Sequence, residues 1–284
     1  MITESGAERF RRGGVKPVRR NAGGWLMQSV TKRSDMDLHM SIDFLHVPPL
    51  PTVLLAAGLG TRLTPVTEYL PKCLVPVNGR PLLGYWLDMC RSHGLPAVVN
   101  THYKAETVAA YVRDSHAGQN VEIFHEPELL GTAGTLLALQ NRLSGGPFMV
   151  VHADNLSFFS LPEFWAAHAG RPRDCLMTMM LFEAENPQSC GIVRVDESGV
   201  VTEFFEKVPS PPGRLANAAA YIMEPGIFSV LRSADAARDI SLDLLPLCLG
   251  RIFTFFNGDY HRDIGTVESY ALAQAETWLR TQGR

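Results

Sequence analysis

Short apolar runs alternate with helix-like segments between residues 52 and 152, and this alternation restricts the fold more than any other feature. Strands are expected at 52–56, 97–100, 121–125 and 148–152, and helices at 81–92, 104–115 and 132–142. Buried strands separated by helices are typical of parallel sheets that carry helices on both faces. The sequence therefore predicts a Rossmann-like, three-layer α/β/α domain with a mostly parallel sheet.

The rhythm changes after residue 175, where strand-like segments follow one another with fewer helices between them. Strands are expected at 175–182, 192–195, 200–206, 218–223 and 252–256, and helices near 226–232, 242–249 and 267–279. The residues Asp196-Glu197-Ser198-Gly199 have the composition of a turn between two of these strands. The sheet is therefore expected to be mixed, with a small inserted β region placed like a lid.

Residues 1–49 differ in composition from the rest of the chain. Basic residues lie there among glycines without a sustained apolar period: Arg9, Arg11, Arg12, Lys16, Arg19 and Arg20. Such a segment cannot bury enough apolar surface to fold by itself. We expect a disordered tail or an upstream extension over 1–49, with Met36 or Met40 as alternative starts, and a folded domain over 50–284. A basic tail that binds a partner is the alternative.

Composition excludes several classes of protein. The net charge of −3 provides no basic field for nucleic acid. No apolar run approaches the roughly 18–20 residues of a membrane span, and no secretory signal opens the chain. The cysteines are widely spaced and form no CxxC pair, so we expect buried thiols and a cytoplasmic location instead of a disulfide framework or zinc site. They are Cys73, Cys90, Cys175, Cys190 and Cys248.

A glycine-rich segment follows the first expected strand, where open α/β sheets bind their ligands. It reads LAAGLGTRLTP over residues 55–65 and continues as PKCLVPV over 71–77. Gly58 and Gly60 let backbone N–H groups approach a polyphosphate, while Arg62 and Lys72 add positive charge. A dinucleotide fingerprint would need glycine where Leu63 stands, and the P-loop pattern GxxxxGK[ST] is absent.

The whole segment resembles the signature GxGTRLxPxTxxxPKxLxPV of the sugar-phosphate nucleotidylyltransferases and matches every fixed position. The resemblance extends over about residues 52–275. It implies an enzyme that transfers a nucleoside monophosphate from a nucleoside triphosphate to a sugar 1-phosphate, uses Mg²⁺ and releases pyrophosphate. It also implies that Arg62 and Lys72 are catalytic. The nucleotide would contact Leu55, Ala56, Ala57, Gly58, Gly60 and Thr61.

Two further segments resemble nucleotide-binding elements of this family. The run Gly131-Thr132-Ala133-Gly134 is similar to its GTAG element, which packs backbone against the base and opens a helix. Glu126 lies five residues earlier, where thymidylyl- and uridylyltransferases often carry glutamine. A carboxylate there would accept the N1–H and N2–H of guanine, which favours GTP. The alternative is a solvated loop glutamate.

Two aspartates resemble the metal ligands of the family. Asp154 follows the expected strand at 148–152, and Asp263 opens the element Asp263-Ile264-Gly265-Thr266. Proteins usually hold Mg²⁺ with one or two carboxylates and substrate phosphates. The resemblance therefore assigns Mg²⁺ to Asp154 and Asp263. His152 departs from the small or apolar residue of many relatives, and we expect it to be a core or supporting residue.

The acceptor side is indicated by three shorter resemblances. Phe205-Glu206-Lys207 is similar to an FxEKP element, although Val208 separates the lysine from Pro209. There the lysine binds the sugar phosphate and the glutamate contacts sugar hydroxyls, so Lys207 is expected to be catalytic. Gly191 and Asn217 match residues that face the sugar, whereas Ala219 or Ala220 stands where relatives often have glycine.

The acceptor and the base are less constrained than the reaction. Glu126 and the run from Leu130 to Gly134 look similar to the mannose- and heptose-1-phosphate guanylyltransferases. Uridylyl-, thymidylyl- and cytidylyltransferases, including those of phosphonates and choline phosphate, are alternatives. So are a catalytically silent regulatory subunit and a GT-A glycosyltransferase. We expect small-molecule substrates, no nucleic-acid or membrane partner, and a homo-oligomer as in many relatives.

Overall fold

Strand β1 (Thr52–Leu55) shows how the sequence separates the two faces of the sheet. Its side chains alternate, so Val53 and Leu55 enter one hydrophobic cluster while Leu54 enters another. The computed structural model describes residues 46–116, 118–234 and 237–282. The tail expected over 1–49 lies outside the described residues up to position 45. Among the described residues, Val47 packs against the core beside the buried Leu50.

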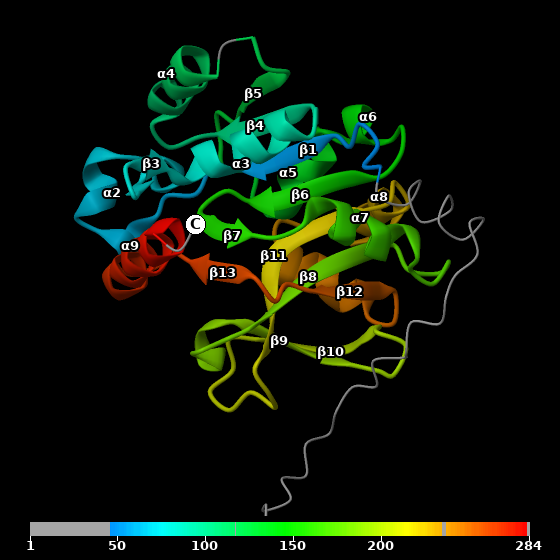
Figure 1. Cartoon of the computed structure of the whole chain (residues 1–284). Coiled ribbons are helices and arrows are strands. Elements are labelled where there is room, and N and C mark those ends of the chain that lie inside the picture. Colours follow the sequence, from blue (N-terminus) through cyan, green and yellow to red (C-terminus); the bar gives the residue numbers. More distant parts are fainter. Residues whose placement is uncertain (1–45, 117, 235–236, 283–284) are drawn as a thin grey trace, which may run out of the picture. The chain divides into compact units, whose positions relative to one another are not determined.

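The central sheet is mixed (Figure 1). Its parallel half runs in the order β5-β4-β1-β6. Here β4 is Ala97–Thr101, β5 is Val121–His125 and β6 is Phe148–His152. The long strand β11 (Leu215–Met223) then pairs antiparallel with both β6 and β8 (Met177–Glu183), and β12 (Ile252–Phe256) extends β8 in parallel.

The expected inserted β region is a hairpin at the end of this sheet. Strands β9 (Gly191–Val195) and β10 (Val201–Glu206) pair antiparallel, and β9 touches β11. The turn between them is closed by Asp196, whose carboxylate accepts hydrogen bonds from the backbone N–H groups of Ser198 and Val200. Gly199 has a φ of 81°, which suits glycine at this turn.

Helices cover both faces of the sheet, which confirms the three-layer Rossmann-like prediction. One face packs against α3 (Leu82–Ser92), α4 (Ala105–Ser115) and α7 (Leu161–Ala169). The other face packs against α5 (Thr132–Ala138), α6 (Gln140–Leu143) and α8 (Ile227–Ser233). Within the described ranges, no helix has the length and apolar composition that crossing a bilayer requires.

A smaller unit beside the sheet joins the glycine-rich segment to the end of the chain. It contains η1 (Thr61–Leu63), α2 (Val66–Tyr69), η2 (Lys72–Leu74), β2 (Pro76–Val77), β3 (Arg80–Pro81) and α9 (Val267–Gln282). It also includes the ribbon of β7 (Asn155–Phe158) and β13 (Tyr260–Asp263). Leu63, Val75, Leu156, Ile264 and Ala273 form its shared apolar cluster.

The structure corrects some expected elements. The helix expected over 242–249 is wrong: the chain forms a π-helical turn, η4 (Ile240–Leu244), followed by a 3₁₀ turn, η5 (Leu245–Cys248). The helix expected over 132–142 is divided at Leu139, where ψ is near 1°. Strands β7 and β13, helix α7 and the turn η3 (Pro187–Ser189) were not expected.

Candidate active site

The glycine-rich segment leaves β1 at the carboxyl edge of the parallel strands. Gly60 has a φ of 66°, and a Cβ there would lie 2.9 Å from atoms of Lys72 and Thr67. Thr67 also donates a hydrogen bond to the carbonyl of Gly60 at 2.9 Å. A Cβ at Gly58 would meet nothing within 4 Å. The segment is therefore fixed at Gly60 by close packing, while the backbone at Gly58 is open to a ligand.

Lys72 lies between the two aspartates that were expected to hold metal. Its Nζ donates to Asp154 Oδ2 at 2.7 Å and to Asp263 Oδ1 at 3.2 Å, although these residues are far apart in the sequence. The Lys72 side chain is 7% exposed, whereas those of Asp154 and Asp263 are 34% and 46% exposed. Arg62 lies at the open side, 3.8 Å from Asp263. The structure thus gathers four predicted residues into one charged cluster.

The ribbon of β7 and β13 explains how the aspartates meet. Asn155 pairs with Asp263, so Asp154 lies one residue before the last pair of the ribbon. Ile264 follows Asp263 and is wholly buried in the apolar cluster of the smaller unit. A Cβ at Gly265 would lie 2.9 Å from the Asp263 carboxylate. Backbone pairing and packing therefore set the position of Asp263.

The cluster holds its charges by mutual attraction. Burial acts to lower the pKa of the Lys72 ammonium, but the neighbouring carboxylates of Asp154 and Asp263 outweigh it, and the pKa is raised. Burial acts to raise the pKa of Asp154, but attraction to Lys72 outweighs it, and the pKa is lowered. Lys72 is therefore a cation and Asp154 an anion at neutral pH.

Two carboxylates face a common cation here, which is the donor set that Mg²⁺ uses when phosphate oxygens complete its shell. Both Asp154 and Asp263 approach the same ammonium within hydrogen-bond distance. In the part of the chain that the structure describes, no three His, Cys, Asp or Glu side chains gather as metal ligands. The residues fit a metal that depends on substrate for its remaining ligands.

Helix α5 begins with the expected residues Gly131, Thr132 and Ala133. Gly131 has a φ of 80°, and a Cβ there would collide with the carbonyl oxygen of Arg238. The N–H of Ala133 donates to that same carbonyl at 2.9 Å. Thr132 Oγ1 accepts from the N–H of Ile240 at 2.7 Å. Hydrogen bonds therefore join the start of α5 to Arg238 and to Ile240, the first residue of η4.

Glu126 is not a solvated loop residue, because only 1% of it is exposed. Its Oε1 accepts from Asn100 Nδ2 at 2.8 Å and from Thr135 Oγ1 at 2.5 Å, and its Oε2 accepts from the N–H of Leu130 at 3.1 Å. Asn100 was not singled out from the sequence. Its place at the carboxyl end of β4, the strand beside β1, was the available signal, since ligands of open α/β sheets bind at the carboxyl ends of the parallel strands.

The expected acceptor residues Gly191, Glu206 and Lys207 lie together at the β9–β10 hairpin. Gly191 pairs with Glu206, and a Cβ at Gly191 would lie 2.6 Å from the Phe204 ring and 2.7 Å from the Glu206 carboxylate. Lys207 Nζ lies 2.8 Å from Glu206 Oε1. Lys207 has a φ of 49°, and its N–H donates to the carbonyl of Cys190 at 3.1 Å. A side chain at 191 would therefore displace the Phe204 ring and the Glu206 carboxylate.

Asn217 lies at an irregularity of β11. The register against β8 shifts between Asn217 and Tyr221. Asn217 Nδ2 donates to the Tyr221 hydroxyl at 2.7 Å, and its Oδ1 accepts from the N–H of Ala219 at 2.9 Å. Ala219 has a φ of 52°, in the left-handed region that favours glycine. The alanine noted from the sequence is thus held in a conformation that costs free energy.

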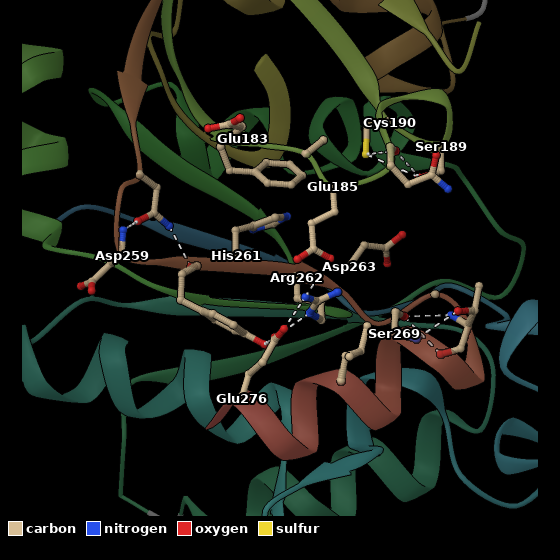
Figure 2. Close-up of a pocket in the computed structure, with 18 of the residues that line it drawn as sticks. Glu183, Glu185, Ser189, Cys190, Asp259, His261, Arg262, Asp263, Ser269 and Glu276 are labelled. Carbon is tan, nitrogen blue, oxygen red and sulfur yellow. Dashed lines mark hydrogen bonds and ion pairs between the residues drawn. The ribbon is translucent and has the colours of Figure 1, made fainter. Parts of the chain in front are cut away.

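A cavity of about 840 Å³ opens beside the charged cluster, and its wall includes Arg62, Asp263 and Cys190. Figure 2 shows Arg262 between Glu276 of α9 and Glu185 of the segment after β8. Arg262 Nε donates to Glu276 at 2.7 Å, and its NH2 donates to Glu185 at 3.2 Å. Arg262 was not expected from the sequence, and it ties the residue next to Asp263 to the terminal helix.

Histidines beside the cluster are held neutral. Burial lowers the pKa of His261 to about 3, with a further contribution from Arg262, and its Nδ1 lies 2.7 Å from Ser157 Oγ. Burial also lowers the pKa of His152, whose Nε2 has no hydrogen-bond partner among the described residues. Both residues therefore add no positive charge beside the cluster, and His261 also lines the cavity.

The chain is similar in sequence to known nucleotidylyltransferases. A family model described as nucleotidyl transferase matches residues 51–278. Mannose-1-phosphate guanylyltransferase of Mycobacterium tuberculosis is 30% identical over 229 residues, covering 79% of this chain and 63% of that protein. UTP–glucose-1-phosphate uridylyltransferase AglF of Haloferax volcanii is 30% identical over 177 residues, covering 62% of this chain and 72% of that protein.

A solved structure is similar over most of the described domain. HddC from Yersinia pseudotuberculosis, complexed with GMP-PN, has a TM-score of 0.66 and 25% identity, covering 80% of this chain and 99% of that chain. The present chain spans less than two thirds of the length of the mycobacterial guanylyltransferase.

Proposed function

Since this chain belongs to the nucleotidyl transferase family, we propose that it transfers a nucleoside monophosphate from a nucleoside triphosphate to a sugar 1-phosphate and releases pyrophosphate. The observation that carries the proposal is the position of Lys72. Its ammonium lies between Asp154 and Asp263, and the Cβ and Cγ of the same side chain lie against Gly60 of the glycine-rich segment. A cation at that place can neutralise charge on a phosphate chain that enters beside Gly58.

In the proposed reaction, an oxygen of the sugar 1-phosphate attacks the α-phosphorus, and pyrophosphate leaves in line with it. The attacking oxygen is already an anion near neutral pH, so no protein group has to remove a proton. Catalysis then consists of positioning and charge neutralisation. Lys72 withdraws charge from the reacting phosphates, Arg62 stabilises the leaving pyrophosphate, and Lys207 docks the phosphate of the acceptor.

The proposal includes Mg²⁺ held by Asp154 and Asp263. The support is that both carboxylates already converge on one cation, the Lys72 ammonium. Bound Mg²⁺ would neutralise negative charge on the phosphate oxygens. We assign different roles to these groups. Lys72 neutralises charge on the reacting phosphates, and the two aspartates hold the metal.

The ligand contacts are also proposals. We assign the nucleotide to the segment from Leu55 to Thr61 and to Gly131, Thr132 and Ala133 of α5. Within the first segment, the N–H groups of Ala56 and Ala57 already donate to Asn100 Oδ1 at 2.6 and 3.3 Å. Gly58, Gly60 and Thr61 are therefore the better candidates for phosphate contacts.

The acceptor is assigned to Gly191, Glu206 and Asn217 near the β9–β10 hairpin. The support is that Gly191 pairs with Glu206, whose Oε1 lies 2.8 Å from Lys207 Nζ, and that Ala216, the neighbour of Asn217, pairs with Ile192 of β9. We propose a mannose- or heptose-type sugar 1-phosphate. The similarity to a mannose-1-phosphate guanylyltransferase supports the first of these acceptors.

We propose GTP as the nucleotide. The support is the similarity to that guanylyltransferase and to a structure complexed with GMP-PN. Uridylyl transfer is the second candidate, because the chain is equally similar, at 30% identity, to a glucose-1-phosphate uridylyltransferase. The proposal also includes a cytoplasmic location and a homo-oligomer.

The test is pyrophosphate release by the purified chain with Mg²⁺, in a matrix of GTP, UTP, dTTP, CTP and ATP against a panel of sugar 1-phosphates. Release with one pair would identify both substrates. Asp154→Ala should abolish most of that release, whereas Asp114→Ala, a change at the exposed end of α4, should not. Absence of release from every pair, with the chain folded, would refute the proposed activity and favour a silent subunit.

A further inference from the structure

Three polar side chains are buried beneath the two segments that we assign to the nucleotide. Asn100 is the last residue but one of β4, Glu126 follows β5, and Thr135 lies in α5. They are 3%, 1% and 0% exposed. Asn100 Nδ2 and Thr135 Oγ1 both donate to Glu126 Oε1, at 2.8 and 2.5 Å. We call these three residues the buried triad. A fully hydrogen-bonded polar group of this kind fixes the elements that carry it.

The buried triad reaches both nucleotide segments through the backbone. Asn100 Oδ1 accepts from the N–H of Ala56 at 2.6 Å and from that of Ala57 at 3.3 Å. Glu126 Oε2 accepts from the N–H of Leu130, immediately before the start of α5. The same carboxylate is therefore connected to the segment after β1 on one side and to the turn before α5 on the other.

The chemistry of Glu126 sets the orientation of the Asn100 amide. Both oxygens of Glu126 accept hydrogen bonds, and Asn100 turns its NH₂ toward Glu126 Oε1 and its oxygen toward the N–H of Ala56. Among the described residues, Glu126 makes no ion pair within 4 Å, and its hydrogen-bond donors are the neutral groups of Asn100, Leu130 and Thr135. A glutamine at position 126 would point its NH₂ group either at the N–H of Leu130 or at the donors of Asn100 and Thr135, so that two donors would face each other.

The geometry points to Glu126 as a positioning residue that, through Asn100, holds the segment 56–60 and the start of α5 at the separation needed to receive a nucleoside triphosphate. This inference rests on the proposed function. It differs from a role in reading the base, because the carboxylate is enclosed and takes its hydrogen bonds from the chain. Selectivity for the base then comes from other contacts.

The test compares Glu126→Gln, Asn100→Ala and the double variant in the pyrophosphate assay with GTP, ITP and UTP. A positioning role predicts that kcat/KM falls about 10- to 100-fold for all three nucleotides, since a buried hydrogen-bonding group is left without its partner. The ratios between nucleotides should stay within about twofold, and KM for the sugar 1-phosphate should not change. The double variant should lose little more than either single variant, because both changes break one connection.

Base reading predicts the opposite pattern. Glu126→Gln would then change the ratio between GTP and ITP or UTP at least about tenfold, while Asn100→Ala would leave that ratio unchanged. Such a result would overturn the inference. Glu122→Gln is the matched control, since it makes the same change on an exposed part of β5, where Glu122 pairs with Arg142.

Amide hydrogen exchange separates this inference from the proposed function. Faster exchange of peptides that contain Ala56 and Ala57 in Glu126→Gln, with the rest of the sheet unchanged, would support positioning even if no substrate pair released pyrophosphate. Unchanged exchange there would refute it. Thr135→Val removes one donor while keeping side-chain shape, and it provides the same measurement if Glu126→Gln does not fold.

Discussion

Replacing Lys72 with methionine keeps most of the side-chain volume and removes the ammonium from between Asp154 and Asp263. At 2.7 and 3.2 Å, the two attractions amount to about 6 and about 5 kcal/mol at an effective dielectric constant of ~20. The cost of burying the ammonium, several kcal/mol, opposes them. Loss of a partner costs about 3–5 kcal/mol when the remaining charge is buried and about 0–1 kcal/mol when it is exposed.

The expected loss of stability lies between the buried and the exposed limit, because both aspartates are partly exposed. Asp154 and Asp263 are 34% and 46% exposed, so water can replace part of the lost attraction. We expect Lys72→Met to lower the free energy of unfolding by about 2 kcal/mol, measured by urea denaturation. Mg²⁺ alone should then raise the unfolding midpoint more in the variant than in the unaltered chain, because Lys72 no longer competes for the two carboxylates.

The effect on the reaction should be larger than the effect on folding. Removal of one preorganised charge lowers kcat by roughly 10²–10³-fold in comparable sites. Pyrophosphate release at saturating substrates measures this loss. Lys104→Met removes the same charge at the start of α4, where the ammonium lies over the Tyr103 ring, and should leave kcat unchanged. Full turnover by folded Lys72→Met would show that this lysine has no part in the chemistry.

Three other changes test separate features. Gly131→Ala should destabilise the fold by at least about 2 kcal/mol in urea, because the new Cβ collides with a carbonyl and φ is 80°. Gly145→Ala, where a Cβ meets nothing within 4 Å, should not. Ala219→Gly should stabilise it by about 1 kcal/mol by relieving a φ of 52°, and an unchanged melting temperature would contradict that strain. His168 is buried, and burial with Arg171 lowers its pKa to about 3. In the unfolded chain this histidine binds a proton below about pH 6.5, whereas in the folded chain it stays neutral. The free energy of unfolding should therefore be highest above this pH and about 2 kcal/mol lower at pH 5. His168→Gln should reduce this dependence of stability on pH.

The local sequence pattern was sufficient to predict the strands in the parallel half of the sheet. The strands at Val121–His125 and Phe148–His152 match their expected bounds, because short apolar runs between turn residues leave few alternatives. The charged cluster was also predictable, since Lys72, Asp154 and Asp263 each belong to a recognisable sequence element. The structure brings these three residues within hydrogen-bond distance.

Where sequence reasoning failed, the deciding contact lies elsewhere in the chain or in a capping residue. The apolar period at 242–249 suggested a helix, but Asp239 caps the N–H groups of Ser241 and Leu242, and Pro246 lacks the donor that an α-helix needs there. Strands β7 and β13 are short and become visible only when paired with each other. The role of Asn100 likewise depends on which strand lies beside β1, which the sheet order determines.

The ribbon of β7 and β13 also dictates when the charged cluster can exist during synthesis. Ser157 and His261, which face each other across it, are 104 positions apart. At ~5–20 residues per second, the ribosome needs roughly 5–20 s to supply the second strand after the first. During that interval β1, β4 and β6 can already pair, but Asp263, the second carboxylate of the cluster, has not yet been synthesised. A nascent chain can therefore form part of its sheet before the charged cluster assembles.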